Sequence, residues 1–148
     1  MLVAVVGVAV LVALAAPATA ADPGKRFAHN RGTWASGLEP IEVHGSVKGP
    51  RSISIRVEWR GKAIPPGAMA AAAEAIPDGG IKVQWRVNCP TPNRGRRTNG
   101  TLNISSSPTL RALRLPSGRG PFCLVDAMAT GPSDDSIGKI LLDLYART

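Results

Sequence analysis

The strongest constraint on the fold is a strict alternation of apolar and polar residues along residues 51–60 and 81–89. Both segments contain a six-residue run of the same type, IRVEWR at 55–60 and IKVQWR at 81–86. Because successive side chains of a strand point to opposite faces of the sheet, a period of two predicts strands with one buried and one exposed face. The similarity ends after six residues, so we interpret the two segments as two core strands that each need one apolar and one polar face, not as a repeat.

Five further segments are predicted to be strands, namely residues 41–48, 101–106, 109–115, 122–130 and 137–146. The last two would form a C-terminal hairpin, although its leucine-rich stretch, Ile140 to Leu144, is also compatible with a helix. Asp134-Asp135 in the hairpin connection is predicted to serve as turn residues, since aspartate commonly bonds its own backbone there. Seven short strands at this spacing are typical of an antiparallel β-sandwich or barrel.

Residues 65–76 differ from the rest of the chain. Alanine occupies five of the six positions from 70 to 75, with Pro65-Pro66 before the run and Pro77 after it. Alanine is the best helix former and proline marks helix boundaries, so we predict one short helix that crosses an end of the sheet.

The first twenty residues are almost continuously apolar and end in Ala18-Thr19-Ala20. This pattern is typical of a secretory signal peptide and its cleavage site, and we predict a signal peptide over residues 1–20. No Lys or Arg lies within these residues, although signal peptides usually begin with a basic region, so an uncleaved membrane anchor stays an alternative.

Residues 21–38 show no sustained period. We predict an N-terminal extension there, ordered only if Phe27 or Trp34 docks on the domain, and a single β-sandwich domain over residues 39–148.

Cys89 and Cys123 are the only two cysteines. In a secreted chain two cysteines are expected to form one disulfide. Cys89 continues the apolar parity of residues 81–87 and Cys123 shares that of Val125, so the disulfide is predicted in the core, where it could join two sheets. A zinc site would need two further ligands at suitable spacing, so no metal is predicted.

In outline, these features resemble the immunoglobulin-like sandwich, which combines short antiparallel strands with a buried disulfide. The chain departs from that family because Trp85 precedes Cys89 by four residues, whereas the family places its tryptophan after the first cysteine. The family's aspartate and tyrosine before the second cysteine are also absent. The resemblance therefore implies an all-β antiparallel sandwich of about seven strands and leaves its topology unassigned.

The net charge of +8 is unevenly distributed. Residues 79–125 contain no Asp or Glu and eight Lys or Arg, whereas the rest of the chain carries ten basic and ten acidic residues. The whole excess therefore lies in the part of the chain that contains both cysteines. A field of one sign favours polyanionic partners, and the alternative is a solvated surface that only aids solubility.

The densest basic segment is the Pro/Gly/Asn-rich stretch around Arg94-Gly95-Arg96-Arg97, which we predict to be a loop tip. The planar guanidinium group binds phosphate, sulfate or carboxylate through paired hydrogen bonds. We predict an anion-binding site that consists of Arg94, Arg96, Arg97, Arg111, Arg114 and Arg119. No aromatic residue lies between Trp85 and Phe122 to stack on bases, so no specific nucleic-acid partner is predicted.

Catalytic motifs are absent from the sequence: there is no nucleophile elbow, no His-Glu-x-x-His and no glycine-rich phosphate loop. His44 and Glu58 both have outward parity and could pair across neighbouring strands as the acid and base of a ribonuclease, but no surrounding motif supports the pairing.

Asn99-Gly100-Thr101 and Asn103-Ile104-Ser105 match the glycosylation sequon, and Asn99-Gly100 is equally a hairpin turn pair.

The sequence thus predicts a secreted or cell-envelope protein that is not an enzyme and uses no cofactor. Its expected class is a binding module for an anionic surface or polymer. The alternative class is a protein-interaction or protease-inhibitor domain that presents the disulfide-braced loop 90–100 to a protein partner.

Overall fold

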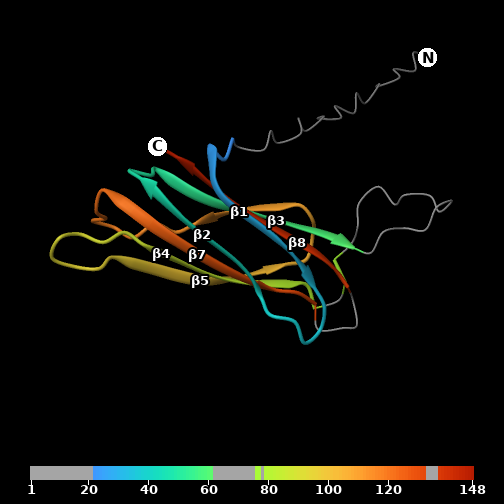
Figure 1. The fold of residues 1–148 in the computed structure, drawn as a ribbon. Helices are drawn as coiled ribbons and strands as arrows, with labels where there is room; N and C mark the ends of the chain where they lie inside the picture. The colour runs from blue at the N-terminus through green and yellow to red at the C-terminus, as the bar shows by residue number, and fades with distance from the viewer. Residues whose placement is uncertain (1–21, 62–75, 78, 133–136) are drawn as a thin grey trace, which may run out of the picture.

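The computed structural model describes residues 22–61, 76–77, 79–132 and 137–148 and shows eight strands in two antiparallel sheets (Figure 1). In the first sheet the order is β1 (Lys25–Trp34), β8 (Gly138–Arg147), β3 (Ser52–Gly61) and β6 (Thr109–Leu113). In the second sheet the order is β2 (Ile41–Lys48), β7 (Phe122–Thr130), β4 (Ile81–Asn88) and β5 (Arg97–Ile104). The predicted all-β antiparallel sandwich is confirmed.

The period-two alternation builds the core, because the inner faces of both sheets pack against each other. On β3, Ile53, Ile55 and Val57 are completely buried, and on β4 Val83 and Val87 are completely buried. Full burial of each such side chain contributes about 1.5–3 kcal/mol from removal of apolar surface from water. The strands predicted from this pattern, 41–48, 51–60 and 81–89, are therefore confirmed.

The predicted disulfide joins Cys89 and Cys123, and both residues are completely buried. Cys89 follows the last residue of β4, and Cys123 is the second residue of β7, the strand that pairs with β4 up to Asn88 and Leu124. The disulfide therefore links neighbouring strands of one sheet and does not join the two sheets. Parity predicted the burial correctly, but parity cannot specify which strands are neighbours.

Residues 25–34, expected to belong to an extension, form β1, which pairs with β8 along its whole length. This segment was expected to be ordered only if Phe27 or Trp34 docks on the domain, and Trp34 does. It is 8% exposed, and its Nε1 donates a hydrogen bond to the Pro132 carbonyl oxygen at 3.1 Å. The alternation was invisible in the sequence because the register shifts between Arg26 and Ala28, which moves later side chains to the other face.

β5 begins at Arg97, four residues before the predicted start at Thr101. Asn99-Gly100, interpreted as a turn pair, lies inside this strand, where Gly100 is opposite Trp85 of β4. A Cβ atom at Gly100 would lie 2.7 Å from Cζ2 of Trp85, so the glycine leaves room for the indole ring. The glycine thus marks a close approach of an aromatic ring, not a reversal of the chain.

The C-terminal segment is a strand and not a helix. Ile140, Leu142 and Leu144 of β8 are completely buried and alternate with partly exposed residues.

Three predictions lie outside the described residues: the signal peptide at 1–20, the Asp134-Asp135 turn and the 65–76 helix, apart from buried Ile76. In the described part of the chain there is no helix, and hence none of a length and hydropathy that would cross a membrane.

Candidate anion-binding surface

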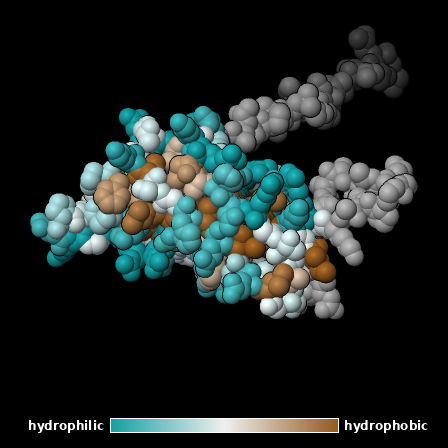
Figure 2. Space-filling model, viewed as in Figure 1, coloured by the Kyte–Doolittle hydropathy of each residue, from teal (hydrophilic) through white to brown (hydrophobic). Residues whose placement is uncertain are grey.

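The antiparallel sheets bring one terminus of every strand to the end of the sandwich beside the disulfide. At this end β2, β4, β6 and β8 finish, and β1, β3, β5 and β7 begin. It lies at the left of Figure 1, where the β4–β5 loop projects, and Figure 2 shows hydrophilic residues at the outermost part of this tip, with hydrophobic residues exposed directly behind it. Residues that are far apart in the sequence therefore contribute to one surface.

Five of the six predicted arginines lie at this end: Arg94 and Arg96 in the β4–β5 loop, Arg97 at the start of β5, and Arg114 and Arg119 between β6 and β7. Backbone contacts tie the two segments together beside the disulfide. Cys89 N donates to Arg96 O at 2.7 Å, and Gly120 N donates to Cys89 O at 3.2 Å. The Thr98 hydroxyl also donates to the carbonyl oxygen of Arg114.

The tip of the β4–β5 loop is closed by contacts between Thr91 and Arg94. Thr91 N donates to Arg94 O at 2.7 Å, and Arg94 N donates to Thr91 Oγ1 at 3.0 Å. The Arg94 side chain is exposed, whereas that of Arg96 is half-buried. The loop thus presents its outer arginine from a backbone that is already ordered.

Four further cations lie at this end that were not predicted from the sequence: Lys25, Lys48, Arg51 and Arg147. All four are exposed. They lie in segments whose acidic residues cancel their charge along the sequence, so a local charge count gives no signal. Lys48 and Arg51 flank Gly49-Pro50, a pair of residues typical of turns, and this signal could have placed both cations at strand ends.

We call these nine residues the basic end: Lys25, Lys48, Arg51, Arg94, Arg96, Arg97, Arg114, Arg119 and Arg147. Among the described residues, Asp22 supplies the one acidic side chain there, with Oδ2 3.5 Å from Nη2 of Arg147. The other eight cations make no ion pair with a described residue. The basic end therefore carries a strong field of one sign.

Arg111 is not part of the basic end. It lies within β6, opposite Ile55 of β3, and its side chain is exposed at the edge of the first sheet. The structure therefore separates this predicted site residue from the other five.

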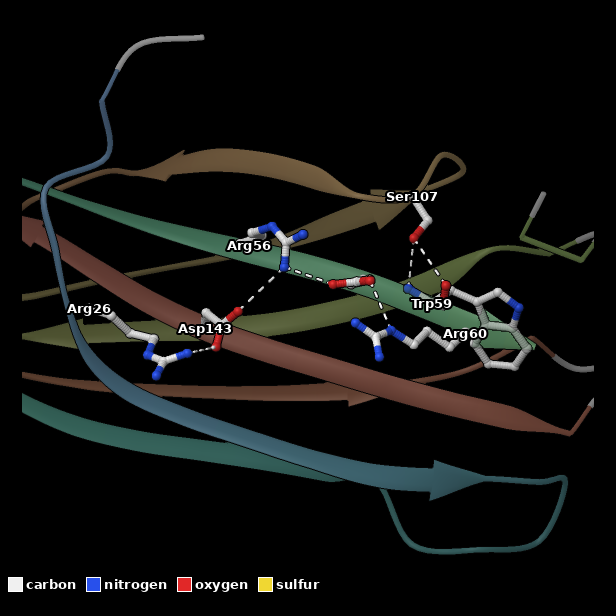
Figure 3. Close-up of polar contacts among 7 residues, drawn as sticks. Arg26, Arg56, Trp59, Arg60, Ser107 and Asp143 are labelled. Carbon is white, nitrogen blue, oxygen red and sulfur yellow. Dashed lines mark hydrogen bonds and ion pairs between the residues drawn. The ribbon is translucent and has the colours of Figure 1, made fainter. Parts of the chain in front are cut away.

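A second basic feature, which we call the arginine row, lies on the outer face of the first sheet (Figure 3). Nη1 of Arg26 lies 3.4 Å from Oδ1 of Asp143, whose Oδ2 lies 3.5 Å from Nη1 of Arg56. The same Arg56 nitrogen lies 2.8 Å from Oε2 of Glu58, whose Oε1 accepts a hydrogen bond from Nε of Arg60 at 3.0 Å. Three arginines are thus linked in sequence by two carboxylates.

The Glu58 carboxylate of the arginine row stays ionised at neutral pH. Burial alone would raise the pKa of Glu58, but hydrogen bonds from Arg60 and Arg56 and their positive charges lower it below its ordinary value of 4.5. The row borders a hollow of about 780 Å³ that is also lined by His29 and Arg31.

The outer face of the second sheet carries a cluster of mixed charge, the His44 cluster. His44 Nδ1 lies 2.7 Å from Asp126 Oδ1, and Arg86 Nη2 lies 3.3 Å from Asp126 Oδ2. The hydrogen bond to Asp126 raises the pKa of His44, with Glu42 adding to the effect, and the bond from His44 is the main cause that lowers the pKa of Asp126. These side chains line a shallow hollow of about 470 Å³.

His44 and Glu58 cannot act together as an acid and base pair. His44 lies on β2 of the second sheet and Glu58 on β3 of the first, so their side chains point away from each other on opposite outer faces. The pairing considered from parity is therefore wrong, because outward parity does not tell which sheet a strand joins. Within the described ranges no group of His, Cys, Asp or Glu side chains is arranged to hold a metal ion.

No protein-family model matches the chain, and no curated protein matches it in sequence. Among solved structures, the chain is similar to the carbohydrate-binding module TmCBM61, solved in complex with β-1,4-galactotriose. The TM-score is 0.41 and the identity 9%, and the match covers 79% of this chain and 69% of that chain. A match of this strength carries no argument about function.

Proposed function

We propose that this protein is a secreted, non-catalytic module that binds an anionic polymer or surface through its basic end. The proposal is supported most directly by nine cations that gather at one end of the sandwich, where Asp22 is the single acidic side chain among the described residues. Such a field attracts polyanions and holds them by many contacts that are individually weak. The buried disulfide agrees with an oxidising, extracytoplasmic compartment.

The order of the arginine-bearing backbone also favours binding. The Cys89–Cys123 disulfide and the hydrogen bonds among Cys89, Arg96 and Gly120 hold the two loops before any ligand arrives. Less conformational entropy is lost when an ordered loop binds, so more of the contact energy is available as affinity.

The test measures binding of the oxidised protein to long-chain polyphosphate as a function of salt. The variant Arg94→Ser/Arg97→Ser/Arg119→Ser removes three exposed charges and leaves half-buried Arg96 in place. We expect the wild type to bind at physiological salt and the variant to lose most of that binding. The slope of log K against log salt should fall by about 2, since each lost phosphate contact accounts for about 0.7 on a single-stranded polyanion.

The matched control compares Arg97→Ser with Lys82→Ser. Both residues are exposed on the β4–β5 hairpin and each substitution removes one positive charge, but Lys82 lies at the far end from the disulfide. Only Arg97→Ser should weaken binding. Equal weakening by both substitutions would mean that the basic end contributes only net charge and is not a binding site. Binding to a protein partner that does not depend on salt would favour the alternative, an interaction domain that presents loop 90–100.

A further inference from the structure

The arginine row has hydrogen-bonding capacity that its ion pairs do not use. Arg26 and Arg56 contact carboxylates only through Nη1, and Arg60 only through Nε. A guanidinium group has five N–H donors, so most donors of the row make no hydrogen bond with a described residue. The two carboxylates contact all three arginines, and the same five side chains line the hollow on the outer sheet face.

Two further cations on the same face have no carboxylate partner among the described residues. Arg31 of β1 is exposed opposite Leu141, and Lys139 of β8 is exposed opposite Arg60. With the three arginines of the row, five cations therefore share this face with the two carboxylates, Glu58 and Asp143. The face keeps a net positive charge even with every ion pair formed.

The arginine row begins where the basic end stops. Arg26 directly follows Lys25 at the start of β1, and Arg51 precedes the first residue of β3, which is opposite Arg147. From there the row runs along β3 to Arg60, which is four residues, or about 13 Å, beyond Arg56. Positive charge is thus continuous from the tip of the sandwich onto its broad face.

We propose that the ligand is a flexible linear polyanion that wraps from the basic end onto the arginine row, an inference that rests on the proposed function. The tip and the broad face meet at the rim of the sheet, so a planar surface can lie against one of them but not against both. A flexible chain with repeated phosphate or sulfate groups can bend over the rim and contact both. The ligand class is therefore a linear polymer and not a flat anionic surface.

The experiment uses two variants of the full oxidised protein, the basic-end variant Arg94→Ser/Arg97→Ser/Arg119→Ser and the face variant Arg31→Ser/Lys139→Ser. Neither of the two substitutions on the face breaks an ion pair between described residues, so the fold is expected to persist. Affinity is measured for long-chain polyphosphate, for tripolyphosphate and for vesicles of phosphatidylglycerol in phosphatidylcholine. The single variant Arg31→Ser is compared with Lys82→Ser as its matched control. Each substitution removes one exposed positive charge, but Lys82 lies on the outer face of the other sheet.

We expect the face variant to bind long-chain polyphosphate about fivefold to tenfold more weakly than the wild type, since two exposed contacts are lost. Its affinity for tripolyphosphate should not change, because so short a chain occupies only the denser basic end. The basic-end variant should lose affinity for both probes.

Three results would overturn this inference. Unchanged binding of long-chain polyphosphate by the face variant, together with loss in the basic-end variant, would leave the proposed function standing without the face. Strong vesicle binding that depends on only the basic end or only the arginine-row face would indicate that the ligand is a flat anionic surface. Unchanged binding by both variants would remove the proposed function as well.

Discussion

His44 and Asp126 show at the residue scale how one contact between neighbouring strands links charge to pH. Because the pKa of His44 is raised above 6.5, the contact stabilises the fold fully below pH 6.5 and this contribution is lost as pH rises through the raised value. The pKa of Asp126 is lowered below 3.8, so its contribution is present above pH 3.8 and is lost as pH falls through the lowered value. The pair therefore acts between these limits.

We predict that Asp126→Asn lowers the pKa of His44 towards 6.5, because the hydrogen bond to Asp126 is the main cause of the shift. Glu42→Gln should lower it by less, since Glu42 contributes least. A titration of the His44 imidazole protons by NMR measures both values. A His44 pKa that is the same in Asp126→Asn and the wild type would show that the contact does not hold in solution.

Gly100 shows why single residues can mislead sequence interpretation. Asn-Gly is the strongest short signal for a hairpin turn, yet here the pair lies within β5. The glycine is needed because the Trp85 ring occupies the space of a side chain. That requirement comes from a residue on the partner strand, so it cannot be detected in the local sequence.

At the scale of elements, β1 depends on the docking of Trp34. We predict that Trp34→Ala lowers the free energy of unfolding by about 3–5 kcal/mol, because it leaves a cavity in the core and removes the hydrogen bond to Pro132. Urea unfolding measures the change. Leu38→Ala is the matched control, since Leu38 is 51% exposed just after β1 and its truncation should have little effect. Equal stability of Trp34→Ala and the wild type would show that Trp34 does not dock on the domain, as expected if residues 21–38 were an undocked extension.

The disulfide acts on the β4–β7 pair and the loops beside it. We predict that Cys89→Ala/Cys123→Ala lowers the free energy of unfolding by about 3–4 kcal/mol, the value that the chain-entropy model gives for a ring that closes over a separation of 34 residues. Urea unfolding of the variant and of wild type treated with dithiothreitol should give the same loss. A reductant that destabilises the double variant as much as the wild type would contradict this explanation.

At the scale of the whole molecule, folding collects the nine cations of the basic end, which the unfolded chain keeps apart. Their mutual repulsion should therefore decrease stability most at low ionic strength. We predict that raising NaCl from about 0.01 M to about 0.15 M, which shortens the screening length from about 30 Å to about 8 Å, raises the Tm of the wild type.

The Tm of Arg94→Ser/Arg97→Ser/Arg119→Ser should rise less over the same salt range, because fewer like charges remain to be screened. Lys82→Ser should respond as the wild type does. A thermal scan at several salt concentrations measures all three proteins. Identical salt responses would mean that the charges at this end do not interact in the folded state.

The sequence by itself determined the strands that have one buried and one exposed face, predicted at 41–48, 51–60 and 81–89, and the buried disulfide. Alternation and parity are local properties, so they can be read along the chain. Only the tertiary structure decided that β1 joins a sheet, that Cys89 and Cys123 bridge neighbouring strands, and that Lys25, Lys48 and Arg147 join the arginines at one end. Those features depend on which strands pair, because antiparallel pairing brings distant residues together in a way that no local pattern records.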